Sequence, residues 1–253
     1  MLKIERQTKI IKYLNINGSL KITDIANEFN CSEETIRKDL VELESKTNLV
    51  KTHGGAYLKS FYDKGFSYEI RETLMKKEKE YIAKIAVEYI KNNDTIFLDS
   101  STTCIELAKK ILETKFFVTI ITNSLQIANL FNNNSNNKLI LIGGEFKSKN
   151  KTFIGYNTTN TISSYIVDIA LVSYPSIDME YGLGDNTIEE LMIRNLMLKQ
   201  AKQKVLLLDH TKFTEKDSVV FSKIENINII ITDNKPTEEW VCYLEKAGIY
   251  VKF

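Results

Sequence analysis

The sequence predicts an α/β protein in two parts, a small helical head followed by a larger domain built on a mostly parallel sheet. Two observations carry this prediction. Within residues 1–57, apolar residues recur at helical spacing in three stretches, and a glycine-containing hairpin pattern follows. Beyond residue 76, short and continuously apolar segments alternate with helical ones, as in parallel sheets covered on both faces.

Three helices are expected in the head. The first covers about residues 3–15, and its apolar stripe consists of Ile4, Ile10, Ile11 and Leu14. The second begins near Thr23, a suitable N-cap, and turns Ile25, Ala26 and Phe29 inward. Asn30 and Cys31 then form a tight turn. This pattern indicates two short helices joined as in a helix-turn-helix.

The third helix begins after Ser32, which is well suited to cap it. Its acidic first turn, Glu33 and Glu34, suits the positive end of the helix dipole. The inward residues recur at i, i+4 and i+7, and they are Ile36, Leu40 and Leu43. The exposed side of the first half therefore carries Thr35, Arg37 and Lys38.

A hairpin is expected next, with strands over residues 49–52 and 56–58 around a turn at 53–55. Helix-turn-helix plus hairpin is the layout of a winged helix-turn-helix, which places one helix in the major groove of DNA. The residues expected to contact double-stranded operator DNA are Ser32, Thr35, Arg37, Lys38, Lys51, His53 and Gly54. Residues 1–57 hold nine Lys or Arg and eight Asp or Glu, so an interaction module that never touches DNA is the alternative.

Residues 58–75 lack periodicity and are interpreted as a linker, and residues 76–253 as the second domain. A helix is expected from Met75 to about Lys91. The predicted strands are 95–99, 117–122, 138–143, 168–173, 204–209 and 228–232. The helices predicted between and after them lie near 103–112, 124–131, 187–202 and 237–247.

Polar side chains gather where four of these strands end. In an open α/β sheet, ligands bind outside the carboxyl ends of the strands. Backbone N–H groups at a helix start, beside Ser and Thr hydroxyls, favour an anion, and carboxylates accept from sugar hydroxyls. We therefore expect a small phosphorylated polyol here. The expected contacts are Asp99, Ser100, Ser101, Thr102, Thr103, Asn123, Ser124, Gly143, Gly144, Asp209 and Lys212. The alternative is that the hydroxyls and the two aspartates only cap their own turns and that Lys212 is solvated.

The segments SEETIRKDLVELE and LVKTHGGA resemble the N-terminal domain of the DeoR family of bacterial transcriptional regulators. FLDSSTTCIELA, TNSLQIA, LIGGEF and LLLDHTKF resemble that family's effector domain, in the same order. The resemblance implies a sensor domain similar to sugar-phosphate isomerases, which binds a sugar phosphate rather than converting it. Glu190, Arg194 and Arg71 match charged positions of that domain. Lys38 replaces an arginine of the family pattern, and the segment 173–184 departs from it.

These features predict a repressor of a sugar-metabolism operon, released from DNA by a phosphorylated sugar, and not an enzyme. Two alternatives stay open: a sugar-phosphate isomerase or deaminase with an appended helical domain, and a constitutive DNA binder with a degenerate sensor. His210, beside Asp209, is the observation that most favours the enzyme. Because proteins that bind symmetric DNA sites are usually dimers or larger oligomers, a homodimer or homotetramer is expected.

Composition bounds the remaining possibilities. The net charge of +1 predicts no general attraction to polyanions or membranes, and no stretch reaches the length of a membrane span. The cysteines Cys31, Cys104 and Cys242 are isolated, so we expect reduced thiols in a cytoplasmic protein, with no metal and no cofactor. Only four basic residues are arginines, namely Arg6, Arg37, Arg71 and Arg194. In a lysine-biased chain, each suggests a position that needs a planar donor of several hydrogen bonds.

Overall fold

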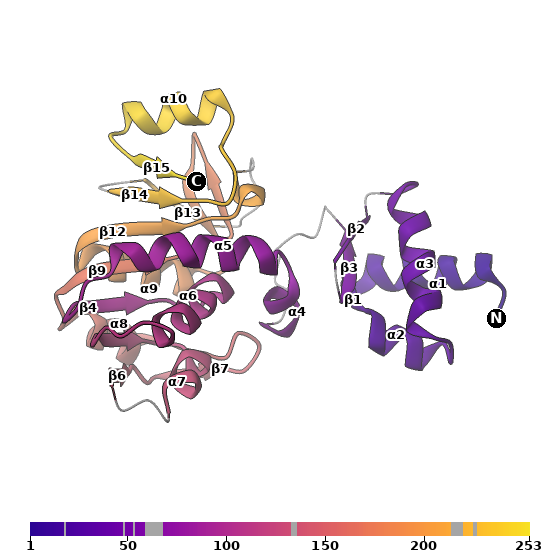
Figure 1. The fold of residues 1–253 in the computed structure, drawn as a ribbon, viewed down its shortest axis with the longest axis horizontal. Helices are drawn as coiled ribbons and strands as arrows, with labels where there is room; N and C mark the ends of the chain where they lie inside the picture. Colours follow the sequence, from indigo (N-terminus) through magenta and orange to yellow (C-terminus); the bar gives the residue numbers. More distant parts are fainter. Residues whose placement is uncertain are drawn as a thin grey trace. The chain divides into compact units, whose positions relative to one another are not determined.

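The computed structural model describes residues 1–17, 19–47, 49–52, 54–58, 68–132, 136–213, 220–224 and 227–253. The chain divides into two compact units, Met1–Met75 and Lys76–Phe253. Figure 1 shows both as ribbons. His53 and most of the expected linker lie outside the described residues.

The N-terminal unit is a winged helix-turn-helix. Its elements in chain order are α1 (Lys3–Asn17), β1 (Ser19–Lys21), α2 (Ile22–Glu28), α3 (Glu33–Glu44), β2 (Leu49–Lys51) and β3 (Gly55–Leu58). The strands form an antiparallel sheet in the order β1-β3-β2. The inward residues of α1, α2 and α3 meet in one core around Ile10, Ile25 and Leu40, all of which are fully buried. Helical periodicity predicted the central residues of this core, including Ile10, Ile25 and Leu40.

Two predictions for this unit were wrong. Thr23 does not cap α2, because the helix already begins at Ile22 and its N-cap is Lys21, which makes no side-chain capping bond. Ile4 is 80% exposed, because it lies in the first turn of α1 and off the face that meets the core. In addition, β1 was not predicted from the sequence. This strand is only three residues long and is held by its pairing with β3, so it has no pattern of its own.

The second unit is built on a seven-stranded sheet in which every pairing is parallel. The strand order is β15-β14-β12-β9-β4-β5-β6. The strands are β4 (Thr95–Leu98), β5 (Thr119–Thr122), β6 (Lys138–Leu141), β9 (Val167–Val172), β12 (Ala201–Leu207), β14 (Ile229–Ile231) and β15 (Tyr250–Lys252). The first six were predicted within a few residues. The predicted α/β fold class is confirmed.

Helices cover this sheet on both faces (Figure 1). Those that the sequence predicted are α5 (Lys76–Ala86), α6 (Thr102–Leu112), α7 (Leu125–Phe131), α9 (Ile188–Lys199) and α10 (Glu238–Lys246). The expected helix from Met75 ends earlier than Lys91 and continues as a 3-10 turn, η2 (Val87–Tyr89). Two helices were not predicted, α4 (Tyr68–Thr73) and α8 (Tyr156–Ser163). α8 is rich in Thr, Asn and Ser, which are weak helix formers, so its periodicity is faint.

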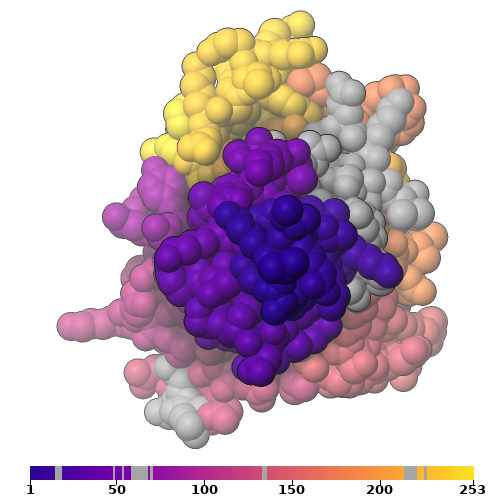
Figure 2. All heavy atoms as spheres, turned by 90° about the vertical axis from the view of Figure 1, so that its right-hand side faces the viewer, coloured from indigo at the N-terminus to yellow at the C-terminus, as the bar shows by residue number. Residues whose placement is uncertain are grey.

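Two small antiparallel sheets flank the main one. The first joins β7 (Glu145–Lys147) and β8 (Thr152–Ile154), and the second joins β10 (Ser176–Asp178), β11 (Gly182–Asp185) and β13 (Val220–Ser222). The departing segment 173–184 thus forms a hairpin. In Figure 2 the yellow C-terminal segment and the pink atoms from the region of residues 110–150 lie at opposite ends of this unit, as the strand order requires.

Candidate DNA-reading and effector sites

Helix α3 presents the predicted reading residues on its outer side. Ser32 caps it, since its Oγ accepts from the backbone N of Thr35 at 3.2 Å. The Arg37 side chain is 39% exposed and lies 3.4 Å from Glu33, while that of Lys38 is 76% exposed and 4.0 Å from Glu34. These exposed pairs are weak, so both cations can be redirected to DNA at little cost.

The described part of the wing carries Lys51 and Gly54. The backbone N of Lys51 donates to Oε1 of Glu44, and this bond ties β2 to the end of α3. The carbonyl of Gly54 accepts from the backbone N of Ile22 at 2.9 Å. A Cβ added at Gly54 would meet nothing within 4 Å, so the turn is open on that side.

An ion pair that was not predicted from the sequence fixes the orientation of α3. Arg6 of α1 pairs with Asp39, whose side chain is 2% exposed, on the face of α3 that turns towards α1. Gln7 donates to the same carboxylate and to Glu42. Asp39 raises the pKa of Arg6 through their hydrogen bond. The first helix therefore positions the third, and the scarcity of arginine was the available signal for it.

In the second unit, the sheet brings the predicted effector residues to one edge. β12, β9, β4, β5 and β6 are neighbours in the sheet and all run parallel, so the segments that follow them emerge on one side. β5 and β6 lie on one side of β4, whereas the later strands lie on the other. The order therefore reverses between β4 and β9, and such a switch point is where open α/β sheets bind ligands.

The turn after β4 is rich in buried hydroxyls. Ser101 caps α6 by accepting from the backbone N of Cys104, and its own N and Oγ donate to Oδ1 of Asp99. Ser100, Thr102 and Thr103 are 3–6% exposed, and none of their hydroxyls has a hydrogen-bond partner within the described residues. These hydroxyls and the start of α6 are the groups that remain available to an anion.

Asn123 and Ser124 follow β5. Ser124 caps α7, whereas the Nδ2 of Asn123 donates to Oγ1 of Thr152 at 2.8 Å and to the carbonyl of Phe153. Asn123 is 2% exposed, and its Oδ1 is buried with no hydrogen-bond donor among the described residues. Because an unmatched buried acceptor is costly, this oxygen is well suited to a ligand hydroxyl.

The two glycines after β6 differ. A Cβ on Gly144 would come within 2.1 Å of Oγ1 of Thr158 and 2.5 Å of the carbonyl oxygen of Ile154, whereas one on Gly143 would meet nothing within 4 Å. Thr158 also donates to the carbonyls of Gly143 and Ile154. Gly144 therefore holds the strand end against α8, and only Gly143 leaves room beside it.

The segment after β12 places Asp209 and Lys212 in the interior, at 1% and 6% exposure. Oδ1 of Asp209 accepts from the backbone N of Thr211 and caps the 3-10 turn η3 (His210–Lys212). The alternative of a solvated Lys212 is therefore wrong, because the turn directs this side chain inward.

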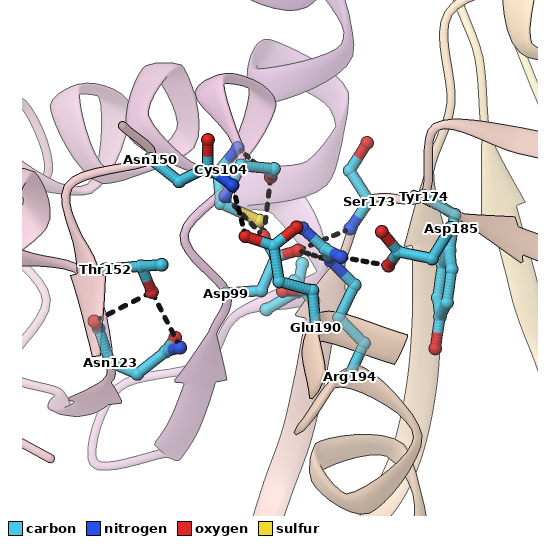
Figure 3. A network of polar contacts seen from close by, with 12 residues as sticks. Asp99, Cys104, Asn123, Asn150, Thr152, Ser173, Tyr174, Asp185, Glu190 and Arg194 are labelled. Carbon is cyan, nitrogen blue, oxygen red and sulfur yellow. Dashed lines mark hydrogen bonds and ion pairs between the residues drawn. The ribbon is translucent and has the colours of Figure 1, made fainter. Parts of the chain in front are cut away.

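A buried arginine occupies the switch point itself (Figure 3). Nε of Arg194, on α9, lies 2.7 Å from Oδ2 of Asp99, and its guanidinium also pairs with Asp185 on β11. The backbone N of Ser173 donates to Asp99 as well, at 3.3 Å. Both oxygens of Asp99 are thus held by protein groups. In this arrangement Asp99 positions the site, whereas the sequence had favoured a contact between this carboxylate and a sugar hydroxyl.

Three carboxylates raise the pKa of this one cation, those of Asp185, Asp99 and Glu190. Glu190 lies one helical turn before Arg194 and accepts from Asn150. Burial raises the pKa of Asp185 to about 6 even though Arg194 lowers it. Burial would lower the pKa of Arg194, but Asp185 and Asp99 raise it well above its ordinary value. The Tyr174 ring lies 5.8 Å from the guanidinium, and its hydroxyl donates to Asn195.

The head and the sheet edge together define a DNA-binding regulator with a ligand-sensing domain. A family model described as the DeoR-like helix-turn-helix domain matches residues 6–60, and one described as the DeoR C terminal sensor domain matches residues 75–234. The chain belongs to the DeoR family of transcriptional regulators, as its sequence resemblance predicted.

Relatives match over their whole length. The HTH-type transcriptional regulator GolR of Listeria innocua is 36% identical over 100% of this chain and 99% of its own. A lactose phosphotransferase system repressor of Staphylococcus epidermidis is 34% identical over 100% and 99%. Among solved structures, ribose 5-phosphate isomerase A of Methanocaldococcus jannaschii aligns over 56% of each chain, with 20% identity and a TM-score of 0.41. No helix in the described part of the chain is long and apolar enough to cross a membrane.

Proposed function

We propose that this protein is a cytoplasmic repressor of genes for sugar metabolism that leaves its operator when a phosphorylated sugar binds. The observation that carries the proposal is the presence, in one chain, of an exposed reading helix and a sheet edge lined with buried hydroxyls and Lys212. The names of two relatives support it, a lactose phosphotransferase system repressor and the HTH-type transcriptional repressor GlcR of Bacillus subtilis, which is 30% identical.

Each part of the edge has a distinct role in the proposed complex. The phosphate lies at the start of α6, where N–H groups and the hydroxyls of Thr102 and Thr103 meet it, and Lys212 supplies positive charge. Oδ1 of Asn123 accepts from a sugar hydroxyl. The ion pair of Asp99 and Arg194 fixes the positions of the strand ends that carry these ligand-binding groups.

Effector binding then shifts the population of the protein away from the form that fits DNA. In a homodimer or homotetramer, two heads must match two half-sites, so a small change between them lowers affinity. A coupling of about 1–3 kcal/mol, or roughly 5–150-fold in affinity, is typical of such control. Since Asp99 is engaged at both oxygens, it is not poised as a general base, which favours sensing over isomerisation.

Fluorescence anisotropy on the DNA upstream of the protein's own gene and of its neighbours tests the proposal. The titration is run at fixed salt, with and without a panel of sugar phosphates, on the full chain and on Asn123→Ala and Lys212→Gln. We expect specific binding that one compound releases, and we expect both variants to bind DNA normally but to resist release. The proposal is contradicted if no compound lowers the affinity for specific DNA, or if the protein converts ribose 5-phosphate.

A further inference from the structure

A second pocket lies beside α10, outside the set of residues assigned to the effector. Its volume is about 740 Å³, which is within the usual range for small-molecule sites. One wall is aromatic, because Phe213 and Trp240 meet edge-on with ring centroids 5.3 Å apart. The polar groups that line the pocket include His210, Glu180, Asn234 and Glu239.

His210 is held in a fixed orientation at the rim of this pocket. Asp233, at the end of β14, accepts from the backbone N of His210 at 2.6 Å and lies 2.6 Å from the ring Nδ1. The Asp233 side chain is 6% exposed, whereas that of His210 is 42% exposed. A carboxylate that fixes Nδ1 leaves Nε2 as the nitrogen that a ligand can reach.

The charge of the pocket argues against a phosphorylated ligand. Three carboxylates line it, those of Asp178, Glu180 and Glu239, and the positive charge of Lys235 is offset by Glu238, 2.6 Å away. A phosphate ester brings close to two negative charges at neutral pH, so these carboxylates would repel it. No cluster of three or more His, Cys, Asp or Glu suited to a metal occurs among the described residues either.

We propose that this pocket binds an uncharged sugar, at a site separate from the one assigned to the phosphorylated effector. An aromatic wall packs against the C–H face of a sugar ring, and planar carboxylate, amide and imidazole groups bond its hydroxyls. The aromatic wall here consists of Trp240 and Phe213. The hydroxyl-bonding groups are those of Glu180, Glu239, Asn234 and His210.

The segment that departs from the family pattern contributes one side of the pocket. Ile177 of β10 forms a parallel bridge with Phe213, which places Asp178, Met179 and Glu180 against the turn after β12. Consecutive residues of that turn therefore serve two sites, Asp209 the effector edge and His210 this pocket.

The chain's only tryptophan lines the pocket, so its emission reports binding directly. The full-length protein is titrated with D-glucose, D-galactose and D-mannose, and with the 6-phosphate of each, following emission and the heat of binding. At least one free sugar is expected to give a saturable change in emission. Its 6-phosphate is expected to bind this pocket at least about ten-fold more weakly. Glu239→Gln and His210→Gln are each expected to lower the affinity for the free sugar by about five-fold or more.

Two further variants test whether the response to a free sugar arises in this pocket. Glu245→Gln, the same change at an exposed position of α10 outside the pocket, is expected to leave the titration unchanged. Asn123→Ala, which removes an effector-edge group, is expected to leave the response to free sugars intact. The proposal is overturned if no sugar changes emission or releases heat, if both pocket variants bind as the wild type does, or if Asn123→Ala abolishes the response.

Discussion

Arg194 and Asp99 are separated by 95 positions in the sequence, yet Nε of the arginine lies 2.7 Å from Oδ2 of the aspartate. This bond lies at the point where the strand order reverses, between β4 and β9. The same guanidinium reaches Asp185, so one buried cation joins α9, the end of β4 and the hairpin of residues 173–185. A buried ion pair therefore organises this edge of the sheet.

Removing this cation is expected to be costly. In Arg194→Leu, two carboxylates lose their partner inside the protein, and breaking a buried pair in this way typically costs about 3–5 kcal/mol of unfolding free energy. Urea unfolding measures the loss. Arg37→Leu is the matched control at a half-exposed arginine, where a loss within about 0.5 kcal/mol is expected. Equal losses for the two variants would show that the network contributes little.

The raised pKa of Asp185 predicts a specific pH dependence. A carboxyl whose pKa rises from 3.8 in the unfolded chain to about 6 in the fold binds more protons when folded. Its contribution to stability is then fully present below about pH 4 and is lost as the pH rises through 6, by an amount on the order of 3 kcal/mol. The difference between urea-unfolding curves of the wild type and Asp185→Asn, from pH 4 to 7, isolates this effect. A flat difference curve would mean that Asp185 titrates normally.

Arg37 and Lys38 are expected to fail in different ways on DNA. If Arg37 reads a base, Arg37→Ala weakens specific binding by about 1–3 kcal/mol and relaxes the preference at one position. Lys38 lacks the planar guanidinium that can form two bonds to one base. Lys38→Ala is therefore expected to weaken binding to all DNA sequences alike, and to lower the slope of log affinity against log salt by about one. Anisotropy at several salt concentrations, on specific and unrelated duplexes, distinguishes the two. A uniform loss for Arg37→Ala would make it a phosphate contact.

The paired glycines after β6 offer a test of the effector edge. Gly144→Ala forces a methyl group into backbone and Thr158, so a loss of about 1–3 kcal/mol in unfolding free energy is expected. Gly143→Ala has open space and should leave stability nearly unchanged. Thermal unfolding compares them, and the response of Gly143→Ala to sugar phosphates reports whether the ligand passes close to that backbone. Similar unfolding temperatures for the two variants would contradict the close packing of Gly144 against α8.

Local patterns were enough to predict much of this molecule. The core of the head follows from apolar spacing, and the cap at Ser32 follows from residue type, because both are settled within one or two helical turns. The parallel sheet follows from its runs of apolar residues. The prediction at Thr23 was wrong because α2 follows β1 directly and begins at Ile22, two residues before the first helical residue that a Thr23 cap would give.

Contacts between distant segments could not be predicted in the same way. Nothing in the neighbourhood of Asp99 indicates that its partner is Arg194, because that pairing depends on the strand order and on where α9 crosses the sheet. The composition did give a partial signal. Of the four arginines, Arg6 and Arg194 both hold buried carboxylates from other elements, as the preference for a planar donor suggested.

The ion pair between Arg6 and Asp39 has a consequence for how this head can be reused. A chimera that transfers only α2 and α3 to another regulator would carry Asp39 without its arginine, and so would import an unpaired charge with the reading surface. The smallest exchangeable module therefore starts at α1. Engineering a new operator preference into this protein is accordingly safer by substitution on the outer side of α3 than by swapping the helix.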